Sequence, residues 1–486
     1  MKPFAALALL AFAVLGAAAV WMGGLNQDEG WYLYAAQLVA EGQVPYRDFF
    51  YTQGPILPVV YSAFAWVWKL WGLLGARIFT LAIGTAGIVF AVALARRSVS
   101  AERRAVAGVM AFLLLGSNLY HLYYLAIPKT YALAALFVMM GFYLLSVAVE
   151  GRSWIALAAA LSLAFAAGTR ISLGMLLVVV GLALLFGRRW RLLVWFCLGG
   201  FAGLALVYGP FLWDAGAREG LVAAQKYHAA RGGFDPVWTV GSFSRLVRWY
   251  LPIFVLVGLH FLASGGQRQD FGSGPVIRMA LFGFIGVFAV QMLAPFPYED
   301  YQVPVMGLLA VFASVTATSE GANRLKLRVL AVLGMTWACS FGSPLLERWS
   351  TNGQDRFWSL KKANYELAQL REVARQINAL DPGGGDILTQ DLYLAIETGR
   401  KVPKGLEMGP FAMLNDAEWR TLLHSAPCAI AALSGYSFAI MPPACTERPV
   451  NEQLEYWSIL KRSYQLVFRE ESFGQNQTTL LVLKKK

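Results

Sequence analysis

Long apolar stretches recur along the chain, and they constrain its fold more than any other feature. A helix needs about 20 mostly apolar residues to cross a bilayer, so the sequence predicts a polytopic α-helical membrane protein with about eleven transmembrane helices. Only 14% of the 486 residues are charged, whereas soluble proteins have about 25%. The predicted spans are residues 3–24, 74–95, 104–124, 129–149, 153–169, 171–187, 191–212, 246–263, 276–294, 302–318 and 328–344.

Basic residues between these spans indicate which loops face the cytoplasm. Residues 55–71 are apolar but short and rich in tryptophan, so we interpret them as an interfacial helix rather than a span. The positive-inside rule then places three basic clusters inside and the loop at 25–73 outside. A signal peptide at residues 1–24, the alternative, leaves that loop on the same face. The clusters are Arg96, Arg97, Arg103 and Arg104; Arg188, Arg189 and Arg191; and Arg324, Lys326 and Arg328.

The composition changes after residue 344. We expect a transmembrane domain at 1–344 and a small C-terminal α/β domain at 345–486, which an odd number of spans places outside. An amphipathic helix is predicted at 355–380, and strands are predicted at 386–389, 428–433, 464–468 and 478–483. Pairing of Cys428 with Cys445 is left open, because two cysteines are a weak signal.

An acidic pair, Asp28 and Glu29, follows the first span directly. A carboxylate at a membrane exit can act as a general base, a metal ligand or an ion-pair partner. The simpler interpretation is that Asp28 caps a helix starting near Gly30, with Glu29 favouring the helix dipole. Both interpretations can hold together, since a cap also fixes the carboxylate in space.

Two cations lie at the predicted outer ends of spans, Lys129 in Ile-Pro-Lys-Thr-Tyr and Arg170 in Gly-Thr-Arg-Ile-Ser. A cation beside the membrane core is costly unless it is paired or used. A lipid-linked phosphate is a natural partner, because a guanidinium group can bind it with two hydrogen bonds. The alternative is that both side chains extend to the lipid headgroups.

Two further polar segments are predicted on the same outer face. Residues 45–55 form a rigid, aromatic-rich loop, whose simplest interpretation is an interfacial anchor with a surface Arg–Asp pair. Residues 295–304 carry Glu299 and Asp300, which also suit the first turn of a helix. The residues expected to support an acceptor site or its loop are Arg47, Asp48, Gln53, Tyr298, Glu299 and Tyr301.

Several common chemistries find no motif in the sequence. There is no P-loop, no His-Glu-x-x-His, no Gly-x-Ser-x-Gly and no paired Cys-x-x-Cys. The four histidines are scattered, so no cofactor is indicated, although His121 is a candidate ligand if a divalent metal binds. Its simpler interpretation is a helix-end residue. The basic residues punctuate apolar segments rather than cluster on a soluble face, which excludes nucleic acid as a partner.

The first outer loop resembles that of bacterial GT-C glycosyltransferases, which include the dolichyl-phosphate-mannose protein mannosyltransferase-like group and the aminoarabinose transferases of lipid A. The shared features are Asp28-Glu29, a Tyr-x-x-Ala, a Glu-Gly, the Pro-Tyr-Arg-Asp-Phe at 45–49 and a helix that starts at Gly54-Pro55. Looser matches are the Arg170 turn and Tyr301-x-x-Pro304. The chain departs from the aminoarabinose transferases at Gln53-Gly54-Pro55, where they have a lysine before two prolines, and relatives often have an acidic residue near Lys129.

The resemblance implies an enzyme that transfers a sugar from a polyprenyl phosphate to a lipid, glycan or protein acceptor, with inversion of the anomeric carbon. Asp28 would be the general base, with Glu29 second, and Lys129 and Arg170 would bind the donor phosphate. The enzyme would lie among the lipids of a bacterial cytoplasmic membrane, with its site and C-terminal domain facing the periplasm. A transporter or flippase of lipid-linked sugars and a non-catalytic envelope scaffold are the alternatives. Neither the sugar, the acceptor, the metal dependence nor the oligomeric state follows from the sequence.

Overall fold

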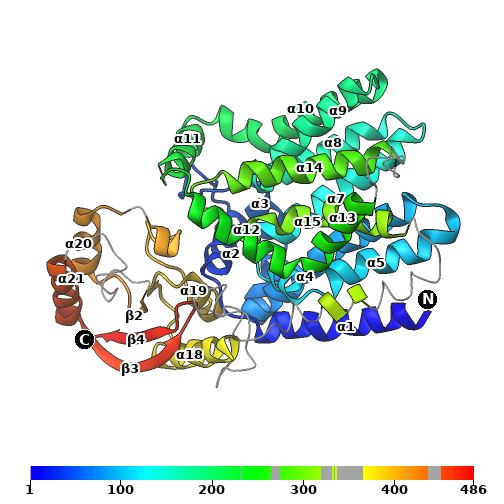
Figure 1. Ribbon diagram of the computed structural model, residues 1–486. Coiled ribbons are helices and arrows are strands. Elements are labelled where there is room, and N and C mark those ends of the chain that lie inside the picture. The colour runs from blue at the N-terminus through cyan, green and yellow to red at the C-terminus, as the bar shows by residue number, and fades with distance from the viewer. Residues whose placement is uncertain are drawn as a thin grey trace.

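A helical bundle and a smaller region with a β-sheet make up the computed structural model (Figure 1). The structure describes residues 2–230, 232–263, 274–318, 331–332, 334–336, 365–412, 414–435 and 450–486. The predicted fold class, a polytopic helical protein with a small C-terminal sheet, is confirmed. The predicted boundary at residue 345 lies outside the described residues, as do most of the span predicted at 328–344 and Cys445. Cys428 is buried and forms no disulfide with another described residue.

Six helices among the described residues are long and apolar enough to cross a membrane, because each offers at least 18 suitable residues. The number rises to eight if two bent pairs each count as one span, and two shorter apolar helices, α8 (Ile155–Thr169) and α9 (Met175–Phe186), lie beside them. The six are α1 (Lys2–Met22), α4 (Ala65–Arg97), α7 (Thr130–Val149), α10 (Trp190–Trp213), α14 (Pro275–Met292), and η3 (Glu299–Gln302) with α15 (Val303–Ala317).

Two predicted spans are bent rather than straight. The stretch at 104–124 is α5 (Arg104–Gly116) followed by α6 (Leu119–Ala126) at 69°, and Asn118 starts α6 by accepting the His121 N–H. The stretch at 246–263 is divided between α12 (Pro236–Trp249) and α13 (Leu251–Ala263), which meet at 91°. Pro252 gives a reason for the second break, because proline lacks the N–H that a continuous helix would use.

The tryptophan-rich stretch at 55–71 forms two short helical pieces. These are α3 (Ile56–Ser62) and the first turns of α4, which end at Gly72 with φ 62° and ψ −153°. Glycine reaches this conformation at little cost, whereas other residues do not. Gly72 therefore forms a kink that separates the long apolar part of α4 from its first turns. Trp66 and Trp71, both exposed, lie on those turns.

The C-terminal region, by which we mean α18 to β4, contains a four-stranded sheet in the order β1-β2-β4-β3. β1 (Ile387–Leu388) pairs parallel with β2 (Ile430–Leu433), and β4 (Thr478–Lys485) runs antiparallel to both β2 and β3 (Tyr464–Phe473). The four predicted strands therefore all form. The helices are α18 (Glu366–Leu380), α19 (Leu392–Thr398), α20 (Asp416–Ser425) and α21 (Val450–Ser463).

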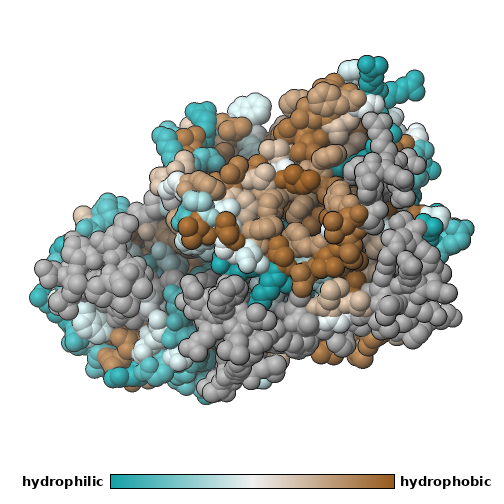
Figure 2. All heavy atoms as spheres, viewed as in Figure 1, coloured by the Kyte–Doolittle hydropathy of each residue, from teal (hydrophilic) through white to brown (hydrophobic). Residues whose placement is uncertain are grey.

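Hydrophobic side chains gather on the surface of the helical bundle, while the C-terminal region is more hydrophilic (Figure 2). Phe186 and Phe201, on α9 and α10, expose 80% and 74% of their surface. A contiguous apolar surface of this kind suits lipid contact.

Helix α2 (Gln27–Ala40) lies where the bundle meets the C-terminal region (Figure 1). A Cβ atom on Gly30 would lie 2.3 Å from the backbone N of Tyr393, so α2 and α19 touch backbone to backbone. Most side chains of α2 are buried between the two parts. The acidic pair that follows the first span therefore lies at a junction rather than on a free loop.

Candidate active site

The first turn of α2 is fixed by a capping box. The Asn26 side chain accepts the N–H of Asp28 at 3.0 Å, and the Glu29 carboxylate accepts the N–H of Asn26 at 2.9 Å. The simpler interpretation of Asp28 as the helix cap does not hold, because Asn26 is the N-cap and α2 begins at Gln27. The Asp28 carboxylate is therefore free for other contacts.

Asp28 belongs to a chain of charged groups. Lys129 Nζ lies 2.8 Å from Asp28 Oδ2 and 3.0 Å from Asp300 Oδ2, so one ammonium joins two carboxylates. The Trp31 indole N–H donates to Asp28 Oδ1 at 3.0 Å, and the Tyr131 hydroxyl donates to Asp300 Oδ2 at 2.8 Å. The Asp28 side chain keeps 26% of its surface exposed, whereas Lys129 and Asp300 keep less than 10%. Asp28 is thus the member that a substrate can reach.

Within this chain of charged groups, Asp28 and Lys129 stabilise each other's ionised form. Burial alone would raise the pKa of Asp28, but Lys129, the Trp31 hydrogen bond and Arg170 outweigh it and hold that pKa below its ordinary value of 3.8. Burial would lower the pKa of Lys129, but Asp28 and Asp300 raise it well above its usual range. Asp28 is therefore ionised and Lys129 protonated near neutral pH.

Arg170 lies beside this chain of charged groups and packs against two aromatic rings. Its guanidinium carbon is 4.0 Å from the centre of the Tyr301 ring and 5.4 Å from that of Tyr131. Such contacts hold a cation in place without using its N–H donors. Within the described ranges Arg170 forms no ion pair and no side-chain hydrogen bond. Its donors are therefore available to an anion.

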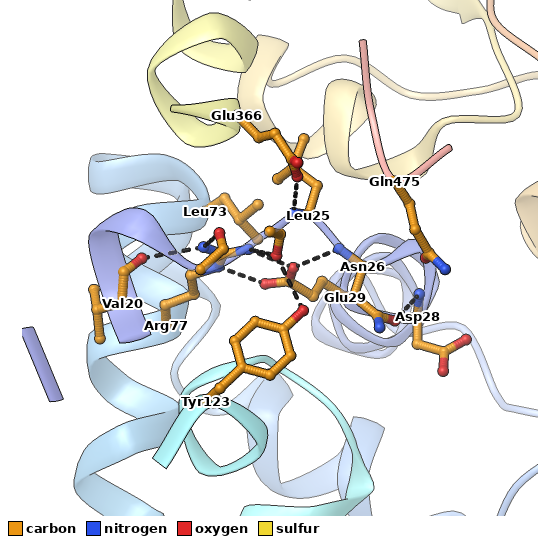
Figure 3. Close-up of polar contacts among 12 residues, drawn as sticks. Val20, Leu25, Asn26, Asp28, Glu29, Leu73, Arg77, Tyr123, Glu366 and Gln475 are labelled. Atoms are coloured by element: carbon orange, nitrogen blue, oxygen red, sulfur yellow. Dashed lines mark hydrogen bonds and ion pairs between the residues drawn. The ribbon is translucent and has the colours of Figure 1, made fainter. Parts of the chain in front are cut away.

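Glu29 points away from Asp28 and into a separate network (Figure 3). Its two carboxylate oxygens accept bonds from Arg77 Nε and Nη2 at 2.7 and 2.6 Å, and both side chains are fully buried. Arg77 also donates to the carbonyls of Val20, Gly23 and Gly24. The structure therefore does not bring Glu29, predicted as the second catalytic carboxylate, to the Asp28 chain.

The loop at 45–55 packs beside the site rather than into the charged chain. Arg47 pairs with Asp48 at 2.9 Å and with Asp214 at 3.4 Å on the surface, and the Gln53 carbonyl accepts the Tyr46 hydroxyl. Asp214 caps α11 (Ala215–Ala229). A Cβ atom on Gly54 would lie 2.0 Å from the carbonyl oxygen of Gly168, two residues before Arg170. Only glycine permits this contact, which fixes the loop against the Arg170 turn.

The neighbouring carboxylates at 299–300 face different partners. Glu299 pairs with Arg245 of α12 at 3.1 Å, while Asp300 meets Lys129. Tyr298 packs against Trp238 of α12, and Tyr301 lies under Arg170. Asp300, which the sequence analysis noted but did not include among the site residues, is the one that joins the charged chain.

Tyr131 and Trp31 were missed by the sequence analysis, although each carries a spacing signal. Trp31 follows Asp28 by three residues, which puts both on one face of a helix. Tyr131 follows Lys129 by two residues, at the point where α7 begins. In both cases a tyrosine or tryptophan lies two or three residues after a predicted charged residue. This spacing is the sequence signal that could have identified both aromatic residues.

His121 lies in another buried contact, with Nδ1 2.9 Å from the Tyr250 hydroxyl. Among the described residues, no group of three or more His, Cys, Asp or Glu side chains is arranged to hold a metal ion. His121 therefore belongs to no such group among the described residues.

No protein-family model matches the sequence, and no curated protein matches it. Solved structures do resemble the chain. ArnT from Cupriavidus metallidurans bound to undecaprenyl phosphate has a TM-score of 0.65 and 16% identity, over 99% of this chain and 97% of that one. The apo state of the same protein has a TM-score of 0.62, at the same identity and coverage.

A more distant likeness is to the archaeal oligosaccharyltransferase AglB from Archaeoglobus fulgidus in complex with an inhibitory peptide and a dolichol-phosphate. Its TM-score is 0.52 at 11% identity, over 96% of this chain and 79% of that one. Both neighbours are GT-C membrane glycosyltransferases. The chain therefore has the GT-C fold, as the first outer loop predicted. Among these structures, the ArnT likeness covers nearly the whole of both chains.

Proposed function

We propose that this protein is a membrane glycosyltransferase that moves a sugar from a polyprenyl-phosphate donor to an acceptor at the outer face of the cytoplasmic membrane. The observation that carries the proposal is that an accessible, ionised Asp28 lies near Arg170, whose N–H donors make no hydrogen bond among the described residues. The GT-C fold supports it, as do the lipid phosphates bound by ArnT and AglB.

Asp28 acts as the general base in this mechanism. The acceptor hydroxyl gives its proton to the Asp28 carboxylate while its oxygen forms a bond to the anomeric carbon of the sugar. The bond from that carbon to the phosphate oxygen breaks, and the electron pair leaves with the polyprenyl phosphate. A single displacement of this kind inverts the anomeric carbon.

Arg170 binds the phosphate, where negative charge grows as the bond breaks. Preorganised cations at a developing charge are a large catalytic contribution. An open cavity of about 330 Å³ is lined by residues on both sides of Arg170 in the sequence and by part of α10 and α11. The lining residues are Ala167, Ile171, Gly174, Leu204, Tyr208, Leu221 and Gln225. Its mostly apolar lining suits an isoprenoid chain.

Lys129 takes a different role from the one that the sequence analysis expected. Its ammonium is already shared by Asp28 and Asp300, so we assign it to keeping Asp28 ionised and oriented. Arg47, Asp48, Gln53, Tyr298, Glu299 and Tyr301 remain proposed supports for the acceptor site and its loop.

The test is a transfer assay with purified protein, radiolabelled polyprenyl-phosphate sugars offered one at a time, and glycolipid, oligosaccharide and peptide acceptors. Asp28→Asn keeps the size of the side chain and an oxygen for Trp31 but removes the base. We expect the transfer rate to fall by about 10²–10⁴-fold.

Asp386→Asn makes the same change on an exposed carboxylate of the C-terminal region and should leave the rate unchanged. Full activity in a folded Asp28→Asn protein would overturn the base assignment. Movement of intact donor across vesicles, without transfer, would indicate a transporter instead.

A further inference from the structure

Three consecutive side chains at the start of α2 reach three different parts of the molecule. Gln27 contacts the C-terminal region, Asp28 contacts Lys129, and Glu29 contacts Arg77 of α4. Successive residues of an α-helix point about 100° apart, so the three cannot turn independently. The position of Asp28 therefore depends on what holds its two neighbours.

Gln27 is bound to the C-terminal region by three hydrogen bonds, the longest from its Nε2 to the Tyr393 hydroxyl at 3.4 Å. Its backbone N–H donates to Gln475 Oε1 at 2.7 Å, and its side-chain Nε2 donates to Asp391 Oδ1 at 2.9 Å. Gln27 is 4% exposed and Asp391 is fully buried. The Tyr393 hydroxyl also donates to Asp391 Oδ1, at 2.9 Å, which fixes the carboxylate that receives Gln27.

Close packing makes this contact rigid. Gly30 lies one turn after Gln27 and meets the backbone of Leu392 and Tyr393, which follow Asp391 directly. Asp391 and Tyr393 therefore contact α2 at Gln27 and Gly30, positions before and after Asp28. A displacement of α19 would carry the first turn of α2 with it.

The chemistry of a general base makes such control consequential. The base must lie within about 2.6–3.2 Å of the proton that it removes, and a misplacement of about 1 Å can cost 10²-fold in rate. Arg77 of the helical bundle fixes the first turn of α2 through Glu29. The Gln27–Asp391 hydrogen bond fixes the same turn from the C-terminal region.

We propose that Gln27 and Asp391 form a latch through which the C-terminal region positions Asp28 for proton abstraction. Both are positioning residues, since neither touches the reacting atoms. The catalytic part of this inference rests on the proposed glycosyltransferase function, whereas the latch itself does not. The C-terminal region would then position the active site rather than being an independent module.

A reciprocal exchange of amide and carboxylate tests the latch in the full-length protein. Gln27→Glu alone removes the donor and sets two buried carboxylates face to face. Asp391→Asn alone keeps an oxygen for the Gln27 amide. Gln27→Glu combined with Asp391→Asn restores the bond with donor and acceptor reversed, because the amide introduced at position 391 can donate to the carboxylate introduced at position 27.

We expect Gln27→Glu to lower kcat by about 10²-fold and to leave the KM for the donor within about twofold. The double variant should recover most of that loss. Glu41→Gln is the matched control, because the Lys401–Glu41 ion pair also joins α2 to the C-terminal region but lies about 20 Å further along the helix. It should leave kcat unchanged.

Hydrogen exchange over residues 25–34 gives a second readout that needs no activity. Exchange should quicken in Gln27→Glu, return to the wild-type rate in the double variant and stay unchanged in Glu41→Gln. If Gln27→Glu does not fold, recovery of folding and kcat in the double variant supports the latch.

Unchanged exchange and kcat in Gln27→Glu would overturn the latch, as would failure of the double variant to recover either one. A wild-type protein that transfers no sugar from any donor would overturn the proposed function, and the exchange rates would then decide the latch alone.

Discussion

One lysine between two carboxylates governs the charge of the candidate site. Lys129 contacts both Asp28 and Asp300, and Asp28 is the more exposed of the two acids. This arrangement keeps a reachable carboxylate ionised in a setting where burial alone would favour its protonated form.

Removal of Lys129 should shift the pH dependence of the reaction. Asp28 accepts a proton only when ionised, which holds above its pKa, and Lys129 lowers that pKa against the effect of burial. In Lys129→Met the pKa of Asp28 rises, so the acid side of the kcat/KM profile should move to higher pH. The measurement is kcat/KM of wild type and variant between about pH 4 and 8.

Lys401→Met is the control, because it removes a lysine from an exposed ion pair with Glu41. Its profile should match that of the wild type. Superimposable acid limbs for Lys129→Met and wild type would show that Lys129 does not set the charge of Asp28.

Sequence reasoning singled out Asp28, Lys129 and Arg170, and the structure brings all three together. The sequence-based site included Glu299 and left out Asp300. The sequence could not rank the two, because adjacent residues in a loop give no sign of which way each side chain faces. The structure supplies the reason: residues 299–302 form a 3₁₀ turn, in which successive side chains point about 120° apart. The two acids differ only in the folded structure, where Asp300 contacts Lys129 and Glu299 contacts Arg245.

At the scale of elements, the Glu29–Arg77 pair joins the start of α2 to the interior of α4. The two residues are 48 positions apart, and Arg77 lies in an apolar stretch that the sequence analysis treated as an ordinary span. Hydropathy alone cannot reveal this pair, because the cost of burying Arg77 is offset by a partner outside the stretch. The partner becomes evident only when the helices pack.

Breaking this pair should destabilise the protein strongly. Arg77→Met leaves Glu29 buried without a countercharge, which typically costs about 3–5 kcal/mol. Arg77→Met combined with Glu29→Met should recover part of the loss, since the unpaired buried charge is gone, but the bonds of Arg77 to three backbone carbonyls and of Glu29 to the Asn26 N–H stay lost. Thermal unfolding of the purified variants in detergent measures both effects.

Arg97→Met is the matched control on the same helix, because Arg97 pairs with Glu150 at the surface. We expect a change of about 0–1 kcal/mol there. Equal unfolding temperatures for Arg77→Met and Arg97→Met would contradict the role given to the buried pair.

At the scale of the whole molecule, we propose that the Asp28 end of the bundle faces outside. Ala40→Cys, on an exposed position of α2, should then react with a membrane-impermeant maleimide in intact cells that carry an otherwise cysteine-free protein. Glu102→Cys, exposed beside Arg103, should react only after permeabilisation. The reverse pattern would turn the whole topology over.

The apolar helical stretches and the strands were predictable, because each depends on apolar residues that lie close in sequence. The 91° bend between α12 and α13 was not, although Pro252 marks its place. The contact between α2 and α19 was the least predictable, because it joins residues more than 300 positions apart through a glycine that has no side chain to signal it.

The bond between Gln27 and Asp391 spans 364 positions of sequence, and this separation imposes an order in time. At about 5–20 residues per second, a ribosome needs roughly 20–70 s to add Asp391 after Gln27. Throughout that interval the membrane helices can insert while the turn that carries Asp28 still lacks one of its holds. If the latch positions Asp28 as proposed, a nascent chain would reach its full transfer rate only after its C-terminal region has been made and has docked against the turn at residues 27–30.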